Sequence, residues 1–361
     1  MKKIYLLLAL TAGLVSCDMD KDPYDSVPDT EALMNPANYQ SARTALYAAL
    51  KSSIAGTFYN APEIQCDGFN AITGYSNTLG DMYRWTYTSQ STTFDGVYGN
   101  YQAIIARANF INYNKADFSN KGLFPDQATS TNPGMPAVRA AKGDAFFMRA
   151  YSIFMLSQYF SPAYDKSNED EPNLGVSYRL DYNPSIDQST YPGRKTLKET
   201  YQQIYDDLDS AAIYVSRDAN YPLYYVSPDA IRALRARAAL AKGDYETAAD
   251  NAERVIVSGN YNLAKSQTDF ANMWQNDNYT DDVELIFQLP TTSTSDLPLA
   301  TGTLFQAQSK GSVPDYVPTQ TLLDLYSAND YRFAAYFSTT DITTNNGAIG
   351  TVYAFNKYPL Y

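Results

Sequence analysis

The sequence predicts a mainly helical fold with long aromatic loops and a few short strands, and three observations favour this class. Apolar residues recur at helical spacing in several segments, which is the primary sign of helices that bury one face. Between these segments glycine and proline interrupt the pattern among many tyrosines, which is typical of loops. One short apolar run, residues 284–290, has the length of a strand. The segments with helical spacing are 36–55, 94–113, 137–160, 194–216, 228–241 and 245–256.

The first half of the chain alternates predicted helices with loops. The helix 36–55 carries tyrosine and leucine on one face, and Gly56 lies just beyond its end. In residues 57–91 glycines alternate with aromatic residues, so we expect a long ordered loop rather than a helix, because aromatic residues argue against disorder. The helix 137–160 is apolar nearly all round, which predicts that it is buried between neighbours.

Residues 227–259 predict two antiparallel helices joined by a tight turn. Ser227 is a typical N-cap followed by proline, and Gly243 lies in the turn between the helices. Small residues such as Ala238 and Ala249 are expected at facing positions, where they let two helices approach closely. The turn resembles that of a tetratricopeptide repeat. One such pair cannot bury both of its faces, so we expect the two preceding helices to pack beside it.

The composition excludes several classes of function. The chain has 27 Lys and Arg against 39 Asp and Glu, a formal net charge of −12. Such an acidic chain is a poor partner for nucleic acid, which is bound through clustered cationic side chains. There is no histidine, which excludes Ser-His-Asp catalysis and imidazole metal sites. Tyrosine is abundant, at 33 residues. Its flat ring and its hydroxyl suit packing in a hydrated, loop-rich protein and also suit contact with the faces of sugar rings.

The N-terminus predicts export and lipidation. Residues 1–16 combine a short basic start with an apolar run too short to span a bilayer, as in a signal peptide. Small residues precede Cys17, so we expect cleavage and lipidation there; an ordinary signal peptide with an incidental cysteine is the alternative. Residues 17–35 predict a solvated, lipid-anchored linker. Cys66 is then the one other thiol, and we expect it to be a small buried hydrophobic residue.

Clusters of carboxylates raise the alternatives of glycoside hydrolysis and of calcium binding. Hydrolysis needs two acidic groups across the scissile bond, but no spacing here is diagnostic, so solvated faces are expected. The run 276–282 lacks the glycine and the alternating ligands of an EF-hand loop, and we expect a polar loop before the strand. The acidic clusters are Glu169–Asp170–Glu171, Asp206–Asp207–Asp209 and Asp281–Asp282.

The aromatic loop 69–87 is the strongest candidate for a ligand site. Sugar rings lie flat on aromatic side chains while polar neighbours bond the hydroxyls, and this loop interleaves both kinds. The alternative is a strand that turns Tyr83, Trp85 and Tyr87 toward a core. Trp274, beside polar residues, is a second candidate. The candidate residues of the loop are Tyr75, Asn77, Asp81, Tyr83, Arg84 and Trp85. We expect Trp85, together with Tyr83 or Tyr75, to form the stacking platform, and Asn77 and Arg84 to bond the hydroxyls.

Four motifs follow the lipidation motif along the chain. They are an "acidic, aromatic, Arg-Ala-aromatic" helix with Asp144, Arg149 and Tyr151; the next helix, with Arg194, Leu197, Tyr201 and Asp207; the repeat pair, with Ala233, Arg237, Gly243 and Tyr245; and a later "Pro-Thr, Leu-Tyr, Asp-x-Arg" stretch with Pro318, Leu325, Asp330 and Arg332. Together and in this order, these segments resemble the SusD/RagB family of nutrient-binding outer-membrane lipoproteins.

The resemblance implies a single SusD-like domain over 36–361, incomplete at the C-terminus, because family members generally continue beyond a Lys-Tyr-Pro stretch like that at 357–359. It implies a lipid-anchored, surface-exposed protein of the outer membrane that binds oligosaccharides and delivers them to a SusC-type TonB-dependent transporter. Binding without bond breaking needs no catalytic residue, cofactor or metal, so we do not expect an enzyme. A surface-anchored glycoside hydrolase and a helical-repeat adaptor are the alternatives, and a peptide ligand is the alternative to a glycan.

Overall fold

The computed structural model of the protein describes residues 32–33, 36–54, 56–113, 134–215, 222–275, 284–289, 304–305, 313–327, 329–343 and 349–357. Helices predominate and the strands are short, as the sequence predicts. The helices are α3 (Pro36–Ser53), α4 (Thr57–Gln65), α5 (Gly80–Tyr83), α6 (Asp95–Tyr113), α7 (Gly134–Phe160), α8 (Leu197–Tyr214), α9 (Pro228–Lys242), α10 (Tyr245–Val257), α11 (Gln267–Gln275), α12 (Gln320–Leu323) and α13 (Tyr331–Tyr336), with a 3₁₀ turn η2 (Gln188–Thr190). The strands are β1 (Phe69–Ala71), β2 (Tyr316–Pro318), β3 (Phe337–Thr343) and β4 (Ile349–Phe355).

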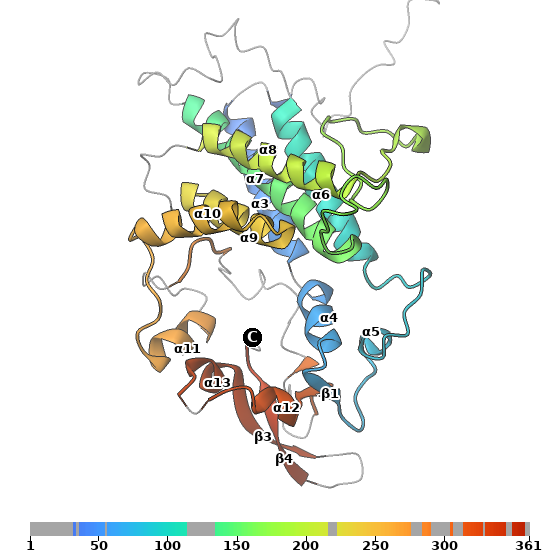
Figure 1. The fold of residues 1–361 in the computed structure, drawn as a ribbon, viewed down its shortest axis with the longest axis vertical. Helices are drawn as coiled ribbons and strands as arrows, with labels where there is room; N and C mark the ends of the chain where they lie inside the picture. Colours follow the sequence, from blue (N-terminus) through green and yellow to red (C-terminus); the bar gives the residue numbers. More distant parts are fainter. Residues whose placement is uncertain are drawn as a thin grey trace, which may run out of the picture.

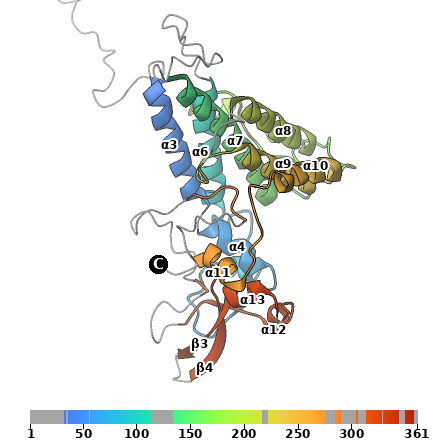
Figure 2. The same cartoon turned by 90° about the vertical axis from the view of Figure 1, so that its left-hand side faces the viewer.

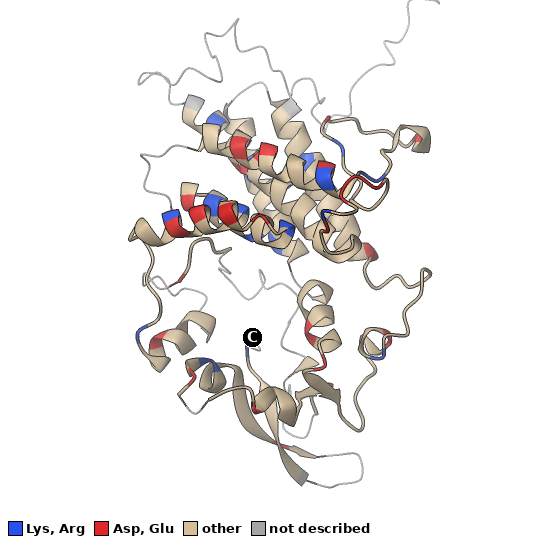
Figure 3. Ribbon diagram, viewed as in Figure 1, with Lys and Arg blue, Asp and Glu red and all other residues tan. Residues whose placement is uncertain are grey.

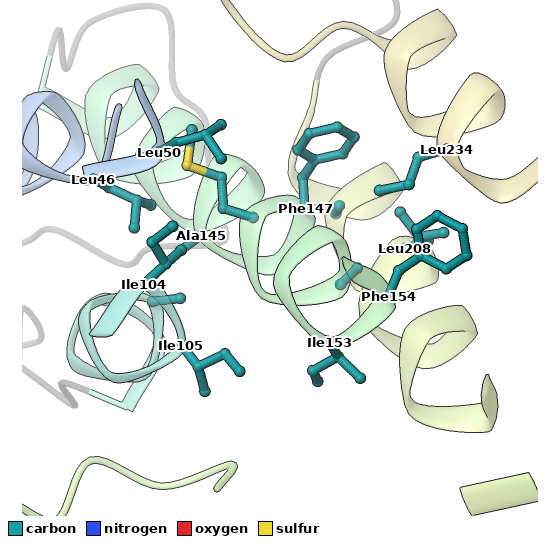
Figure 4. Close-up of a cluster of buried hydrophobic side chains, with 14 of the residues drawn as sticks. Leu46, Leu50, Ile104, Ile105, Ala145, Phe147, Ile153, Phe154, Leu208 and Leu234 are labelled. Carbon is teal, nitrogen blue, oxygen red and sulfur yellow. The ribbon is translucent and has the colours of Figure 1, made fainter. Parts of the chain in front are cut away.

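Six long helices form one part of the molecule, with α7 at its centre (Figures 1 and 2). Helices α3 and α6 lie on one side of α7, and α8 and α9 lie on the other (Figure 4). The close-up shows Leu46 of α3 and Ile104 of α6 facing α7 from one side, and Leu208 of α8 and Leu234 of α9 from the other. All four are buried in one continuous apolar cluster. The prediction that 137–160 is buried between neighbours is therefore confirmed.

The predicted helix pair forms as α9 and α10. Ser227 caps α9 by accepting a hydrogen bond from the backbone N–H of Ala230, and Asp244 caps α10 in the same way. Gly243 ends α9 with φ 77°, the left-handed conformation that glycine adopts without a steric cost. Helix α8, which lies beside this pair, begins with a capping box between Thr196 and Glu199.

A second part of the molecule holds the short helices and all four strands (Figure 1). The antiparallel pair β1–β2 aligns Asn70 with Val317, although more than 200 residues separate them in the chain. The pair β3–β4 forms an antiparallel ribbon that aligns Phe337 with Phe355. A separate apolar cluster fills this part and contains Phe69, Met82, Phe305, Tyr316 and Phe355, among others.

Two expectations about secondary structure are wrong. Residues 57–65 form the helix α4 instead of a loop, and they bury Phe58 and Ile64 on one face, with Pro62 inside the helix. The described residues 284–289 join no sheet. Ile286, Phe287 and Leu289 pack on the helical cluster, so this apolar run covers helices rather than pairing with a strand.

Two expectations about single residues are also wrong. Ala238 is fully buried, but Ala249 is exposed, and Ala248 is the alanine of α10 that is buried. Cys66 is exposed at the C-terminal end of α4, where its thiol donates to the carbonyl of Glu63 at 2.8 Å. Its position at a helix end explains why this small residue lies outside the core.

Candidate functional site

The loop after β1 is held in place by strand β2. Asp315, which precedes β2, accepts hydrogen bonds from the backbone N–H of Ser76 at 2.7 Å and from its hydroxyl at 2.5 Å. Tyr316 donates its hydroxyl to the carbonyl of Thr78 at 2.7 Å and is fully buried. Burial raises the pKa of the Tyr316 hydroxyl, which therefore stays a neutral donor. The loop is thus anchored to a distant part of the chain by two neighbouring residues.

Three of the sequence-predicted residues meet in a polar cluster, which we define as Tyr75, Asn77 and Arg84. Nη1 of Arg84 donates to the hydroxyl of Tyr75 at 2.7 Å and to Oδ1 of Asn77 at 2.9 Å. The Tyr75 hydroxyl donates to the same Asn77 oxygen at 3.0 Å. The cluster closes over Gly80, where an added Cβ would lie only 2.1 Å from Asn77 Oδ1. Glycine at this position is what allows the side chains to approach the backbone so closely.

Trp85 has an unusual backbone conformation. Its φ is 54°, in the left-handed region that tryptophan rarely adopts. The backbone N–H of Trp85 bonds the carbonyl of Met82, and that of Thr86 bonds the carbonyl of Asp81. These two bonds form the Schellman motif that ends helix α5, and Trp85 occupies the position at which glycine is usual. The left-handed conformation costs a residue other than glycine roughly 1–2 kcal/mol of folding free energy. Tryptophan therefore occupies a position at which glycine would be locally more favourable.

Trp85 and Tyr87 form an exposed aromatic platform. The side chains are 60% and 40% exposed, and their ring centroids lie 6.1 Å apart with the planes tilted by 38°. The expected alternative, a strand that turns Trp85 toward a core, is wrong, because residues 80–83 are helical and the indole faces solvent. Exposed rings of this size beside hydrogen-bonding groups are typical of a site that binds flat apolar faces.

The remaining predicted residues lie around or away from this platform. Tyr83 packs on the buried ring of Tyr316, with centroids 5.3 Å apart, and so supports the loop. Asp81 accepts a hydrogen bond from the hydroxyl of Thr93 at 3.3 Å. Trp274 lies on α11, on the other side of this part of the molecule from α5 (Figure 1), where it packs edge-on against Tyr336 at 5.3 Å.

Sequence reasoning missed two contributions to the site. The ring beside Trp85 is that of Tyr87, for which the pattern offers only a core position, whereas the expected partners Tyr83 and Tyr75 pack on Tyr316 instead. Asp315 and Tyr316 anchor the loop, and the local sequence gives no sign of it, because the contact depends on the β1–β2 pairing.

Four members of the acidic clusters in the described residues form ion pairs. Asp207 is buried and pairs with Arg149, Asp209 pairs with Arg235, and Lys198 lies between Glu169 and Asp170. No group of His, Cys, Asp or Glu in the described ranges is arranged to hold a metal ion. The run 276–282 and the lipidation residue Cys17 lie outside the described residues.

Three cavities lie in the described helical part, away from the platform. One of about 370 Å³ among α8, α9 and α10 is lined by Arg235 and Arg254, which pair with Asp209 and Asp250. A polar one of about 400 Å³ lies beside α8, but its Arg179 pairs with Asp181, and its Gln202 bonds Asp206. An apolar one of about 370 Å³ lies among α3, α7, α9 and residues 284–289 and has few polar groups. The aromatic platform is therefore the better candidate for a ligand with both apolar faces and hydroxyls.

None of the described helices combines the length and the apolar character that a membrane crossing needs. Comparison with protein families matches residues 20–240 to a SusD-like family, described as starch-binding and associating with the outer membrane. A search of the curated proteins finds no match.

Solved structures share the fold at low sequence identity. A SusD superfamily protein from Bacteroides thetaiotaomicron is 20% identical with a TM-score of 0.67, over 87% of this chain and 66% of its own. A SusD-like carbohydrate binding protein from Bacteroides vulgatus is 14% identical with a TM-score of 0.66, over 85% and 62%. Surface glycan-binding protein A from Bacteroides fluxus is 18% identical with a TM-score of 0.61, over 89% and 68%. The chain thus spans about two thirds of the length of these structures.

Proposed function

Because the chain belongs to the SusD-like family, we propose that it captures oligosaccharides at the outer membrane without cleaving them. The observation that carries this proposal is the exposed indole of Trp85, held in a conformation that glycine would adopt more easily. A strained, exposed aromatic residue in an ordered loop supports a binding role better than a packing role.

The ligand would contact two groups of side chains. Trp85 and Tyr87 offer flat apolar surfaces to the C–H faces of sugar rings, and removing such an anchor commonly costs about 2 kcal/mol of binding. Asn77 and Arg84, with Asp81 nearby, would bond the sugar hydroxyls. Tyr75 and Tyr83 would support the site, Tyr75 by its hydrogen bonds within the polar cluster and Tyr83 by packing on Tyr316. Trp274 on α11 would make a second sugar contact, separate from the platform.

The setting of the site follows from the same proposal. The protein would be lipidated at Cys17 and held at the cell surface by its acyl chains, with residues 17–35 as the tether. The bound oligosaccharide would pass to a SusC-type TonB-dependent transporter. Both expectations rest on the lipidation motif and on the family, and the variant Cys17→Ala tests the first by its loss from the membrane fraction.

The experiment that tests the function is incubation of the protein with a panel of polysaccharides. We expect retardation in native gels that contain the ligand polysaccharide, with no release of reducing ends. Release of reducing ends would instead support a glycoside hydrolase, and retardation by none of the polysaccharides would contradict glycan binding. A peptide ligand is tested by the same gel method with protein digests as competitors.

A further inference from the structure

Arg84 is one of several exposed arginines that form no ion pair with a described carboxylate, as are Arg107 and Arg194, the latter bonding backbone carbonyls instead. Five arginines at the surface each lie within 3.3 Å of an aspartate, namely Arg179, Arg232, Arg235, Arg254 and Arg332. Arg84 is exposed and bonds only the neutral oxygens of Tyr75 and Asn77. Among the described residues no carboxylate forms an ion pair with it. Its positive charge is therefore not neutralised, although the chain as a whole carries a net charge of −12.

The distribution of charge makes this arginine more distinctive. Basic and acidic residues are interspersed along α8, α9 and α10, whereas the part that holds α5 and the strands carries fewer charged residues (Figure 3). The carboxylates of this loop region, Asp81 of α5 and Asp315, accept hydrogen bonds from Thr93 and from Ser76, and neither forms an ion pair with Arg84. Local attraction there can act against the general repulsion between an acidic protein and an anionic polymer.

The polar cluster also fixes the orientation of the guanidinium. Both bonds to Tyr75 and Asn77 come from Nη1, so the N–H groups of Nε and Nη2 make no hydrogen bond to a described residue. These donors form the edge of a planar fork that matches two oxygens of one anionic group. Gly80 lies directly beneath, where a Cβ would come within 2.8 Å of Nη1, so the fork is seated against the backbone. The adjacent residue in the chain is Trp85 of the aromatic platform.

We propose that the glycan bound at the aromatic platform is acidic, and that Arg84 binds the carboxylate or sulfate of the sugar that stacks on or beside Trp85. This inference rests on the proposed function, since it names the substrate class of the same site. The shared chemistry is an anionic group that presents two oxygens to one guanidinium, and such charge-assisted pairs are about twice as strong as neutral hydrogen bonds.

Affinity electrophoresis of the whole chain tests the proposal. The gels contain polygalacturonate, alginate or chondroitin sulfate as acidic probes, the carboxyl-reduced or desulfated form of each, and amylopectin and xylan as neutral probes. We expect retardation by at least one acidic probe and about tenfold weaker binding of its neutralised form. Arg84→Gln should weaken binding of the acidic probe to the same extent. This variant should therefore bind the acidic probe and its neutralised form with equal strength. Arg107→Gln, which removes an exposed arginine of α6, is the matched control and should change nothing.

Three results of these gels would overturn the acidic-sugar inference while glycan binding stands. Retardation of the native protein by neutral probes alone overturns the acidic-sugar inference. Equal retardation of the native protein and of Arg84→Gln by an acidic probe overturns it as well. Both results leave glycan binding intact. Equal losses in Arg84→Gln and Arg107→Gln would show a general effect of charge and would also overturn it. Retardation by no probe contradicts the proposed function itself, and the inference fails with it.

Discussion

Arg149 of α7 binds both carboxylate oxygens of Asp207 of α8, from Nε at 2.8 Å and from Nη2 at 2.5 Å, and both side chains are buried. Its Nη1 donates to Asn109 of α6 at 2.7 Å, so a single guanidinium joins three helices. On another face of α7, Asp144 accepts from Arg43 at 2.6 Å and from Tyr47 at 2.7 Å of α3. Asp144, Arg149 and Asp207, three charged residues of the family motifs, thus connect α7 to its neighbours.

The variant Arg149→Ala should destabilise the fold strongly. It leaves the buried carboxylate of Asp207 without its charged partner, which commonly costs about 3–5 kcal/mol of unfolding free energy. Urea unfolding measures the loss. The control Arg254→Ala breaks the exposed pair with Asp250 on α10 and should cost less than about 1 kcal/mol. Similar losses in both variants would show that burial does not govern these pairs.

The helix pair gives a second prediction with an internal control. Ala238→Leu places a larger side chain at a fully buried position on α9 and should cost about 1–3 kcal/mol through overpacking. Ala249→Leu adds the same atoms at an exposed position on α10 and should change stability by less than about 0.5 kcal/mol. Thermal melting of the two variants compares them. The same shift in both would mean that the faces of the pair are assigned wrongly.

Gly80→Ala should disturb the polar cluster while the helical part stays folded. The new methyl group would overlap Asn77 Oδ1, and Nη1 of Arg84 would also have to move. We expect glycan retardation to weaken by about tenfold or more, because the misplaced donors no longer meet the ligand. Gly96→Ala, at a position of α6 with open space around the added Cβ, is the control. Unchanged binding in Gly80→Ala would remove the polar cluster from the site.

Most of the helical part could be predicted from the sequence, because its elements are defined locally. Helical spacing marks α6, α7 and α8 to within a few residues, and Ser227 and Gly243 mark the ends of α9. The error at Ala249 has a simple cause: neighbouring small residues point about 100° apart on a helix, and composition alone does not select between them. In β3 and β4 the β-branched residues Thr339, Thr340 and Val352 carry a local strand signal, because such side chains favour strands.

The candidate site was predictable in its members and unpredictable in its geometry. Tyr75, Asn77, Arg84 and Trp85 were selected because aromatic and polar residues alternate in one loop, and the first three do meet. The alternation of residues does not indicate the short helix α5 or the left-handed residue after it. A conformation that runs against the preference of tryptophan cannot be inferred from propensity, and the anchoring of Ser76 and Thr78 by Asp315 and Tyr316 depends on a distant strand pairing.

The most direct test of glycan binding at the aromatic platform is the variant Trp85→Gly, because it separates a ligand contact from a packing contact. Glycine suits the left-handed position after α5, so the free energy of unfolding in urea should be unchanged or higher by about 1 kcal/mol. Loss of the aromatic anchor should weaken retardation by the best polysaccharide of the panel roughly thirtyfold. Retardation equal to that of the native protein, or a variant that no longer folds, would contradict the assignment of Trp85 to the binding site.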